Sequence, residues 1–80
     1  MRNIEYMRSF TFPVVIEKDR DGFYAECPAL EGCSSQGATH DEAVQNIKEA
    51  IQLYLEHLEV NHKEIPKPTL IDLLTVEVTV

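Results

Sequence analysis

The 80-residue sequence predicts a two-layer α+β domain of order β-β-β-α-β, with one amphipathic helix on one face of a mostly antiparallel sheet. Three observations predict it. Short alternating segments separated by turn residues fill the first half, one apolar stripe at helical spacing follows, and a further alternating segment comes last. Because so short a chain supports only one thin core, we expect residues 1–80 to be a single domain.

The first three strands are predicted by alternation and by the turns between them. Phe10–Ile16 is aromatic and β-branched with one apolar face, and Pro13 within it lacks a backbone donor, which marks an unpaired edge or a bulge. Asp21-Gly22 is a hairpin signal, so Phe23–Cys27 is predicted to return antiparallel. Cys33–Gln36 follows a second turn, and its small polar residues suit an edge strand.

The helix has the strongest signal in the sequence. Thr39 and Glu42 fit a capping box, in which the Thr39 hydroxyl accepts from the Glu42 amide and the Glu42 carboxylate reaches back to the Thr39 amide. Leu53 interrupts the polar face. The apolar face is formed by one stripe: Ala43, Val44, Ile47, Ala50, Ile51, Tyr54, Leu55 and Leu58.

The last part of the chain is predicted to be a connector followed by a fourth strand. Pro66 and Pro68 favour an extended connector. Leu74–Val80 alternates without interruption, so we expect it to return to the same sheet with every second residue, from Leu74 to Val80, facing the helix. One helix covers one face, and the other face of the sheet is left open to water or to a partner.

Composition excludes several classes of protein. The chain carries 14 acidic and 7 basic residues, a net charge of −7, which argues against direct binding of nucleic acid and favours a basic partner or simple solubility. It lacks the apolar run of roughly 18 residues that a membrane span needs. The first residues lack an apolar signal-peptide core, so we expect a cytoplasmic protein whose two cysteines stay reduced.

Chemistry-bearing residues are few, and we assign no catalytic, cofactor-binding or metal-binding residue. The spacing of Cys27 and Cys33 lies outside the usual structural-zinc hook. Alternation places Glu17, Tyr24, Glu26 and Glu77 on the open face of the sheet. This set has two interpretations with a function, a Mg²⁺-dependent nuclease that uses the three carboxylates or a contact surface for a basic protein. The alternative without a function is that the charges only confer solubility.

Several motifs together resemble the HicB antitoxin family. They are Phe12–Glu17, Asp21–Cys33, Ser35–Thr39, Asp41–Ala43, Ile47–Ile51 and Ile65–Pro68, and the resemblance runs from about Phe10 to Val80. It implies a partial ribonuclease H-like fold without catalysis. It also implies an antitoxin of a type II toxin–antitoxin pair, whose partner would resemble HicA, a small basic RNA-cleaving toxin.

The resemblance and the open face give three expectations about partners. We expect Tyr24 and Glu26, with Glu17 and Glu77 as weaker candidates, to contact a HicA-like toxin. The bare face and Leu53 predict self-association as a dimer or a higher even oligomer. Many family members continue into a DNA-binding module, whereas this sequence stops at Val80, so we expect no C-terminal DNA-binding domain. An orphan protein-binding module without a toxin is the remaining alternative.

Overall fold

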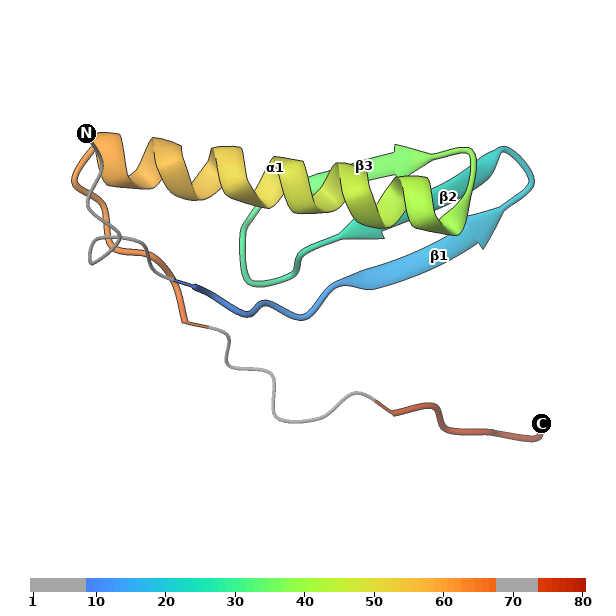
Figure 1. Cartoon of the computed structure of the whole chain (residues 1–80). Coiled ribbons are helices and arrows are strands. Elements are labelled where there is room, and N and C mark those ends of the chain that lie inside the picture. Colours follow the sequence, from blue (N-terminus) through green and yellow to red (C-terminus); the bar gives the residue numbers. More distant parts are fainter. Residues whose placement is uncertain (1–8, 68–73) are drawn as a thin grey trace.

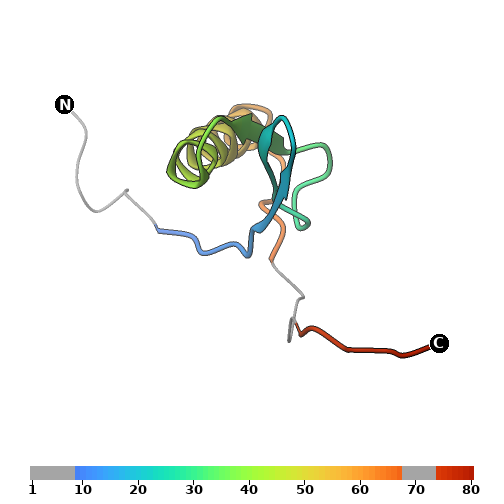
Figure 2. The ribbon, with the colours of Figure 1, turned by 90° about the vertical axis from the view of Figure 1, so that its right-hand side faces the viewer.

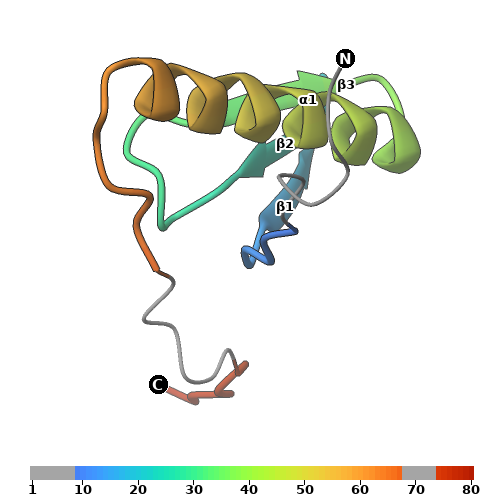
Figure 3. The same ribbon diagram turned by 60° about the vertical axis from the view of Figure 1, so that its left-hand side comes forward.

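The structure, a computed structural model, describes residues 9–67 and 74–80 and has the α+β architecture that the sequence predicts (Figure 1). Three strands, β1 (Val15–Asp19), β2 (Gly22–Glu26) and β3 (Ser34–Gly37), precede one helix, α1 (His40–Val60). The strands form an antiparallel sheet in the order β1-β2-β3. Helix α1 lies across one face of this sheet, as Figure 3 shows.

Strand β1 begins at Val15, five residues later than predicted. Val15 is opposite Glu26, the last residue of β2, and the chain turns away from the sheet directly after Glu26. Residues 9–14 therefore have no strand of this sheet opposite them, and Pro13 could not donate to one. The apolar pattern of Phe10–Val14 is still used, because Phe12 and Val14 pack against the core without belonging to a strand.

The predicted fourth strand is wrong for this single chain. Residues 74–80 form no strand and stay clear of the sheet in two perpendicular views (Figures 1 and 2). Their apolar side chains are exposed, from 66% for Leu74 to 119% for Val80. Alternation shows that a segment can present one apolar face, but it does not specify the edge with which that segment pairs.

The core is small and lies between the helix and strands β2 and β3. Among the described residues, it consists of six buried ones: Ala25, Cys27, Leu30, Cys33, Ala43 and Ile47. Three backbone hydrogen bonds close the loop between β2 and β3. Cys27 N donates to Cys33 O (3.0 Å), Leu30 N donates to Cys27 O (3.1 Å) and Cys33 N donates to Leu30 O (3.0 Å). This loop holds Leu30 in the core, where it is 1% exposed.

The start of helix α1 confirms half of the predicted capping box. Glu42 N donates to Thr39 Oγ1 (3.1 Å). The Glu42 carboxylate, however, accepts from Ala38 N (2.9 Å) instead of Thr39 N, so it caps one residue earlier than expected. Leu53 is 67% exposed on the polar face of the helix, as predicted. Within the described residues, no helix is long and apolar enough to cross a membrane.

Helix α1 is fixed on β3 by two contacts. A Cβ atom added at Gly37 would lie 2.6 Å from Ala43 N and 2.9 Å from the Glu42 carbonyl carbon, so the strand and the first helical turn touch through their backbones. Asn46 Nδ2 donates to Gln36 O (2.8 Å), which ties the next turn to the same strand. The helix therefore packs mainly on β3 and β2, and β1 is the strand farthest from it in Figure 3.

The cap gives the first testable prediction. Thr39→Ala removes the side-chain acceptor of the Glu42 amide and should lower the free energy of unfolding by about 1 kcal/mol. Thr39→Ser keeps a hydroxyl and should retain nearly all of the wild-type free energy of unfolding. Urea denaturation followed by circular dichroism at 222 nm measures both changes. Equal losses in the two variants would contradict a capping role.

The close approach at Gly37 gives the second prediction. Gly37→Ala forces a Cβ into backbone atoms and should cost about 1–3 kcal/mol of stability. Gly32 is the matched control, because it has φ +78° but open space around its Cα. Asparagine tolerates positive φ, so Gly32→Asn should be milder than Gly32→Ala. At Gly37, where the neighbouring backbone limits the space, Gly37→Asn should be more destabilising than Gly37→Ala. If the asparagine variant were the milder one at both sites, the clash at Gly37 would be refuted.

Candidate functional site

The face of the sheet away from the helix is the candidate site, and the strand register defines it. Glu17 is opposite Tyr24, and Tyr24 is opposite Gln36, so these three side chains form one row across the sheet. Glu26 lies in the neighbouring row. Ala25, between Tyr24 and Glu26 in β2, is fully buried on the helix side, so the two rows point away from the core.

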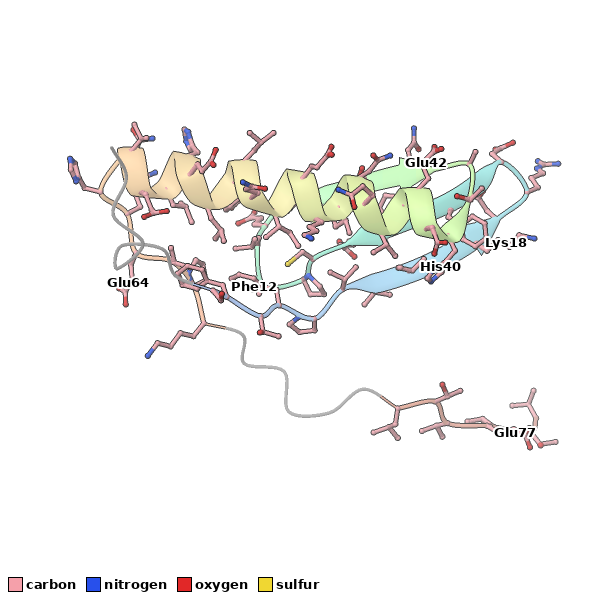
Figure 4. All side chains as sticks on the ribbon, in the orientation of Figure 1. Phe12, Lys18, His40, Glu42, Glu64 and Glu77 are labelled. Carbon is pink, nitrogen blue, oxygen red and sulfur yellow. The ribbon has the colours of Figure 1, made fainter. Side chains whose placement is uncertain are left out.

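The structure brings together three of the four residues that the sequence suggests for this face. Glu17 and Tyr24 are direct cross-strand neighbours, and Glu26 is two residues from Tyr24 on the same side of β2. Glu77 lies on residues 74–80, well away from the sheet (Figure 4). Its placement depended on the fourth strand, which this single chain does not form.

The open face is acidic and contains one large amphipathic side chain. Its outward positions include Glu17, Asp19 and Glu26 but no lysine or arginine. Lys18 faces the other side, where its ammonium group lies 5.9 Å from the centre of the Phe23 ring. Tyr24 is 39% exposed, which leaves its ring available for contact. Such a surface favours a partner that brings positive charge and an apolar contact.

A depression of about 550 Å³ at one end of the sheet adds carboxylates to this surface. The β1–β2 turn meets the start of helix α1 there, and the lining includes Asp19, Asp21 and Glu42 with Tyr24 and Gln36. Asp19 Oδ1 accepts from Asp21 N (2.8 Å), so a turn hydrogen bond holds this carboxylate in place. An open depression lined by three carboxylates can accept a lysine or arginine side chain.

Sequence reasoning missed this depression. Asp21 was explained by the hairpin turn, and Glu42 by the helix cap. The signal that could have revealed it is the order of the strands. Because β3 runs antiparallel to β2, the residues after β3 return to the end of the sheet where β2 begins.

No metal-binding arrangement is found among the residues that the structure describes. Within 9–67 and 74–80, no group of three His, Cys, Asp or Glu side chains could hold a metal ion. The three carboxylates of the nuclease alternative are not brought together, because Glu77 is outside the sheet. His40 follows β3, whereas Cys33 precedes it, so these two residues lie at opposite ends of the four-residue strand.

The two thiols are buried and unbridged. Cys27 is fully buried and Cys33 is 5% exposed. Burial raises the pKa of the Cys27 thiol, although hydrogen bonds from the backbone of Ala29 and Leu30 oppose this effect. Burial also raises the pKa of Cys33, and the neighbouring Cys27 adds to the rise. Both groups are therefore neutral parts of the core and poor nucleophiles.

Comparison with known proteins gives a consistent result. Residues 12–79 match the family described as "HicB_like antitoxin of bacterial toxin-antitoxin system". A UPF0150 protein of Synechocystis is 51% identical over 63 residues, which cover 78% of this chain and 80% of that protein. A UPF0150 protein of Thermoplasma acidophilum is 49% identical over 57 residues, which cover 70% of this chain and 83% of that protein.

The buried thiols predict a loss of stability at alkaline pH. A thiol in the unfolded chain has a pKa of about 8.5. Above that pH the unfolded chain releases protons that the folded chain retains, so the free energy of unfolding falls as the pH rises. The fall ends once the pH exceeds the raised thiol pKa values of the folded chain. Below about 8.5 the stabilisation is fully present. Urea midpoints at pH 7.5 and pH 10, in the presence of a reductant, measure this slope.

The control for this prediction is the double variant Cys27→Ala with Cys33→Ala. It leaves a cavity and should therefore be less stable than the wild type at pH 7.5. Between pH 7.5 and pH 10, the free energy of unfolding of this variant should nevertheless decline less steeply than that of the wild type. An identical slope would show that the thiols do not cause the pH dependence.

Proposed function

Because the chain belongs to the HicB-like antitoxin family, we propose that it neutralises a HicA-like toxin in the cytoplasm by binding it. Membership in this family supports an antitoxin role and implies a toxin partner. The toxin that the family resemblance implies is small, basic and RNA-cleaving. The observation that carries the proposal for this chain is its acidic sheet face with a central exposed tyrosine.

We place the toxin contact on the open face, centred on Tyr24 and Glu26, with Glu17 at its side. Tyrosine gives a large contact area at low entropic cost and is enriched among residues that dominate binding energy. The surrounding carboxylates would steer a basic partner and speed its association. Glu77 remains a weaker candidate, because its position relative to this face depends on where residues 74–80 dock.

The proposed mechanism is occlusion and involves no chemistry by this chain. An acidic surface laid over the active surface of a basic ribonuclease would repel RNA and block its access. The same charge makes direct binding of nucleic acid by this chain unfavourable, so the proposal includes none. We also propose self-association as a dimer or a higher even oligomer.

The toxin contact gives the fourth prediction. Combining Tyr24→Ala with Glu26→Lys should raise the dissociation constant for the toxin encoded beside this chain by about 30-fold or more, as expected for loss of one dominant contact. Glu26→Lys alone should mainly slow association and weaken its dependence on salt. Surface plasmon resonance at several salt concentrations separates these effects, and toxin-catalysed RNA cleavage gives a functional measure.

Glu49→Lys is the matched control. It makes the same charge change at an exposed position of helix α1, away from the sheet face, and should leave affinity nearly unchanged. Full affinity in the variant that combines Tyr24→Ala with Glu26→Lys would place the toxin contact elsewhere. Failure of the neighbouring protein to bind the wild-type chain would contradict the pairing itself.

A further inference from the structure

Cys27 and Cys33 face each other where strand β2 leaves the sheet and strand β3 enters it. The register of these strands ends with Glu26 opposite Ser34, and one further step places Cys27 opposite Cys33. The hydrogen bond from Cys27 N to Cys33 O (3.0 Å) shows that the pairing extends to these two residues. The sequence contains two cysteines, so all of its thiols belong to this pair.

Both side chains of the pair point into the core. Cys27 is two residues beyond Ala25, which is fully buried on the helix side, and Cys27 is itself fully buried on that side. Cys33 is 5% exposed. The neighbouring Cys27 contributes to the raised pKa of Cys33, as expected for two thiols that lie close together. The two sulfur atoms are not bridged.

The backbone of this pair is already placed for a disulfide. Facing residues at a hydrogen-bonded position of antiparallel strands have Cα atoms about 5.5 Å apart, and bridged cysteines most often have Cα atoms about 5.5–6 Å apart. The hydrogen bonds of the β2–β3 loop, which also involve Leu30, hold both cysteines in this position without a bridge. A bridge would therefore join the thiols without rearranging the loop.

We propose that Cys27 and Cys33 are a redox-sensitive dithiol that forms a reversible disulfide within the chain when low-molecular-weight disulfides such as oxidised glutathione accumulate. Facing strand residues have Cβ atoms about 4.5–5.5 Å apart, whereas a bridge needs about 3.5–4.5 Å. The strands must move slightly closer, which makes such a bridge easier to reduce. In the proposed cytoplasmic setting, the thiols are the resting state and the disulfide is transient.

The oxidation is a thiol–disulfide exchange in two steps. One protein thiolate attacks oxidised glutathione, forms a mixed disulfide with one half of it and releases the other half as a thiol. The second protein thiolate then attacks the protein sulfur of the mixed disulfide, which forms the bridge and releases the second glutathione. The two cysteines together lose two electrons and two protons, and one oxidised glutathione becomes two glutathione thiols.

Burial makes this reaction slow without preventing the bridge at equilibrium. The attacking species is the thiolate, and burial raises the pKa of both thiols. A tripeptide disulfide cannot reach side chains that are 5% exposed or less, so the β2–β3 loop must open first. Oxidation should therefore become faster as the pH rises above 7.5.

The bridge lies on the side of β2 away from the proposed toxin contact. Tyr24 and Glu26 point outward from the sheet, whereas Cys27 points into the core. The proposal consequently does not rest on the proposed function, and the chain alone is sufficient to test it.

Equilibration of the full chain with mixtures of reduced and oxidised glutathione tests the proposal. Intact mass and peptide mapping after an acid quench should show a form lighter by two hydrogens, with Cys27 joined to Cys33 within one chain, and dithiothreitol should reverse it. The equilibrium constant for bridging should be about tenfold or more higher in the folded chain than in concentrated urea, because the fold holds the thiols together. By linkage, the bridged chain should unfold at a higher urea concentration than the reduced chain.

Cys33→Ser with Ser35→Cys is the matched control, because it keeps the composition and the side of the strand. Its second thiol faces Ala25 and is diagonal to Cys27, with a Cα separation of about 7–8 Å, which is too long for a bridge without backbone movement. In this variant, the fold should no longer favour bridging over the urea-unfolded state. Because the comparison of folded and unfolded wild type stands by itself, a variant that fails to fold leaves the test intact.

Three results would overturn the proposal. One is a folded wild type that stays reduced at glutathione ratios that bridge it in urea. Another is a disulfide that joins two chains instead of the two cysteines of one chain. The third is a folded control variant that bridges as readily as the wild type, which would show that the facing positions of Cys27 and Cys33 do not matter.

Discussion

The backbone contact between Gly37 and the first turn of helix α1 determines where the rest of the chain can lie. Because no Cβ separates the strand from the helix, the helix begins directly on β3, and Asn46 holds the following turn on the same strand. A single helix fixed at one side of a sheet cannot also cover the far strand. The apolar groove that the described residues form beside β1 follows from this off-centre placement.

The sheet consequently offers two surfaces of different chemistry. The face away from the helix combines carboxylates with Tyr24 and suits a charged, reversible contact. The groove beside β1 is mostly apolar and suits a permanent one. The part of this 80-residue chain that the structure describes buries six side chains in its core, so much apolar surface is left for association. Both surfaces arise from one sheet and one helix.

Local patterns predicted what is determined locally. The Thr39 cap, the long helix and the two faces of β2 were all recoverable, because each depends on residues within a few positions of one another. The start of β1 and the fate of residues 74–80 were not, since both depend on a pairing partner distant in sequence. For the same reason, sequence reasoning grouped Glu17, Tyr24 and Glu26 correctly, misplaced Glu77 and missed the carboxylates around the turn.

The exposure of residues 74–80 has a consequence for the turnover of the protein. Proteases bind substrates as extended peptides, and this segment offers seven such residues, whereas a strand paired in a sheet is protected from cleavage. Any partner that covers these residues would therefore also protect the chain from degradation. The abundance of the protein would then follow the supply of that partner as well as its own rate of synthesis.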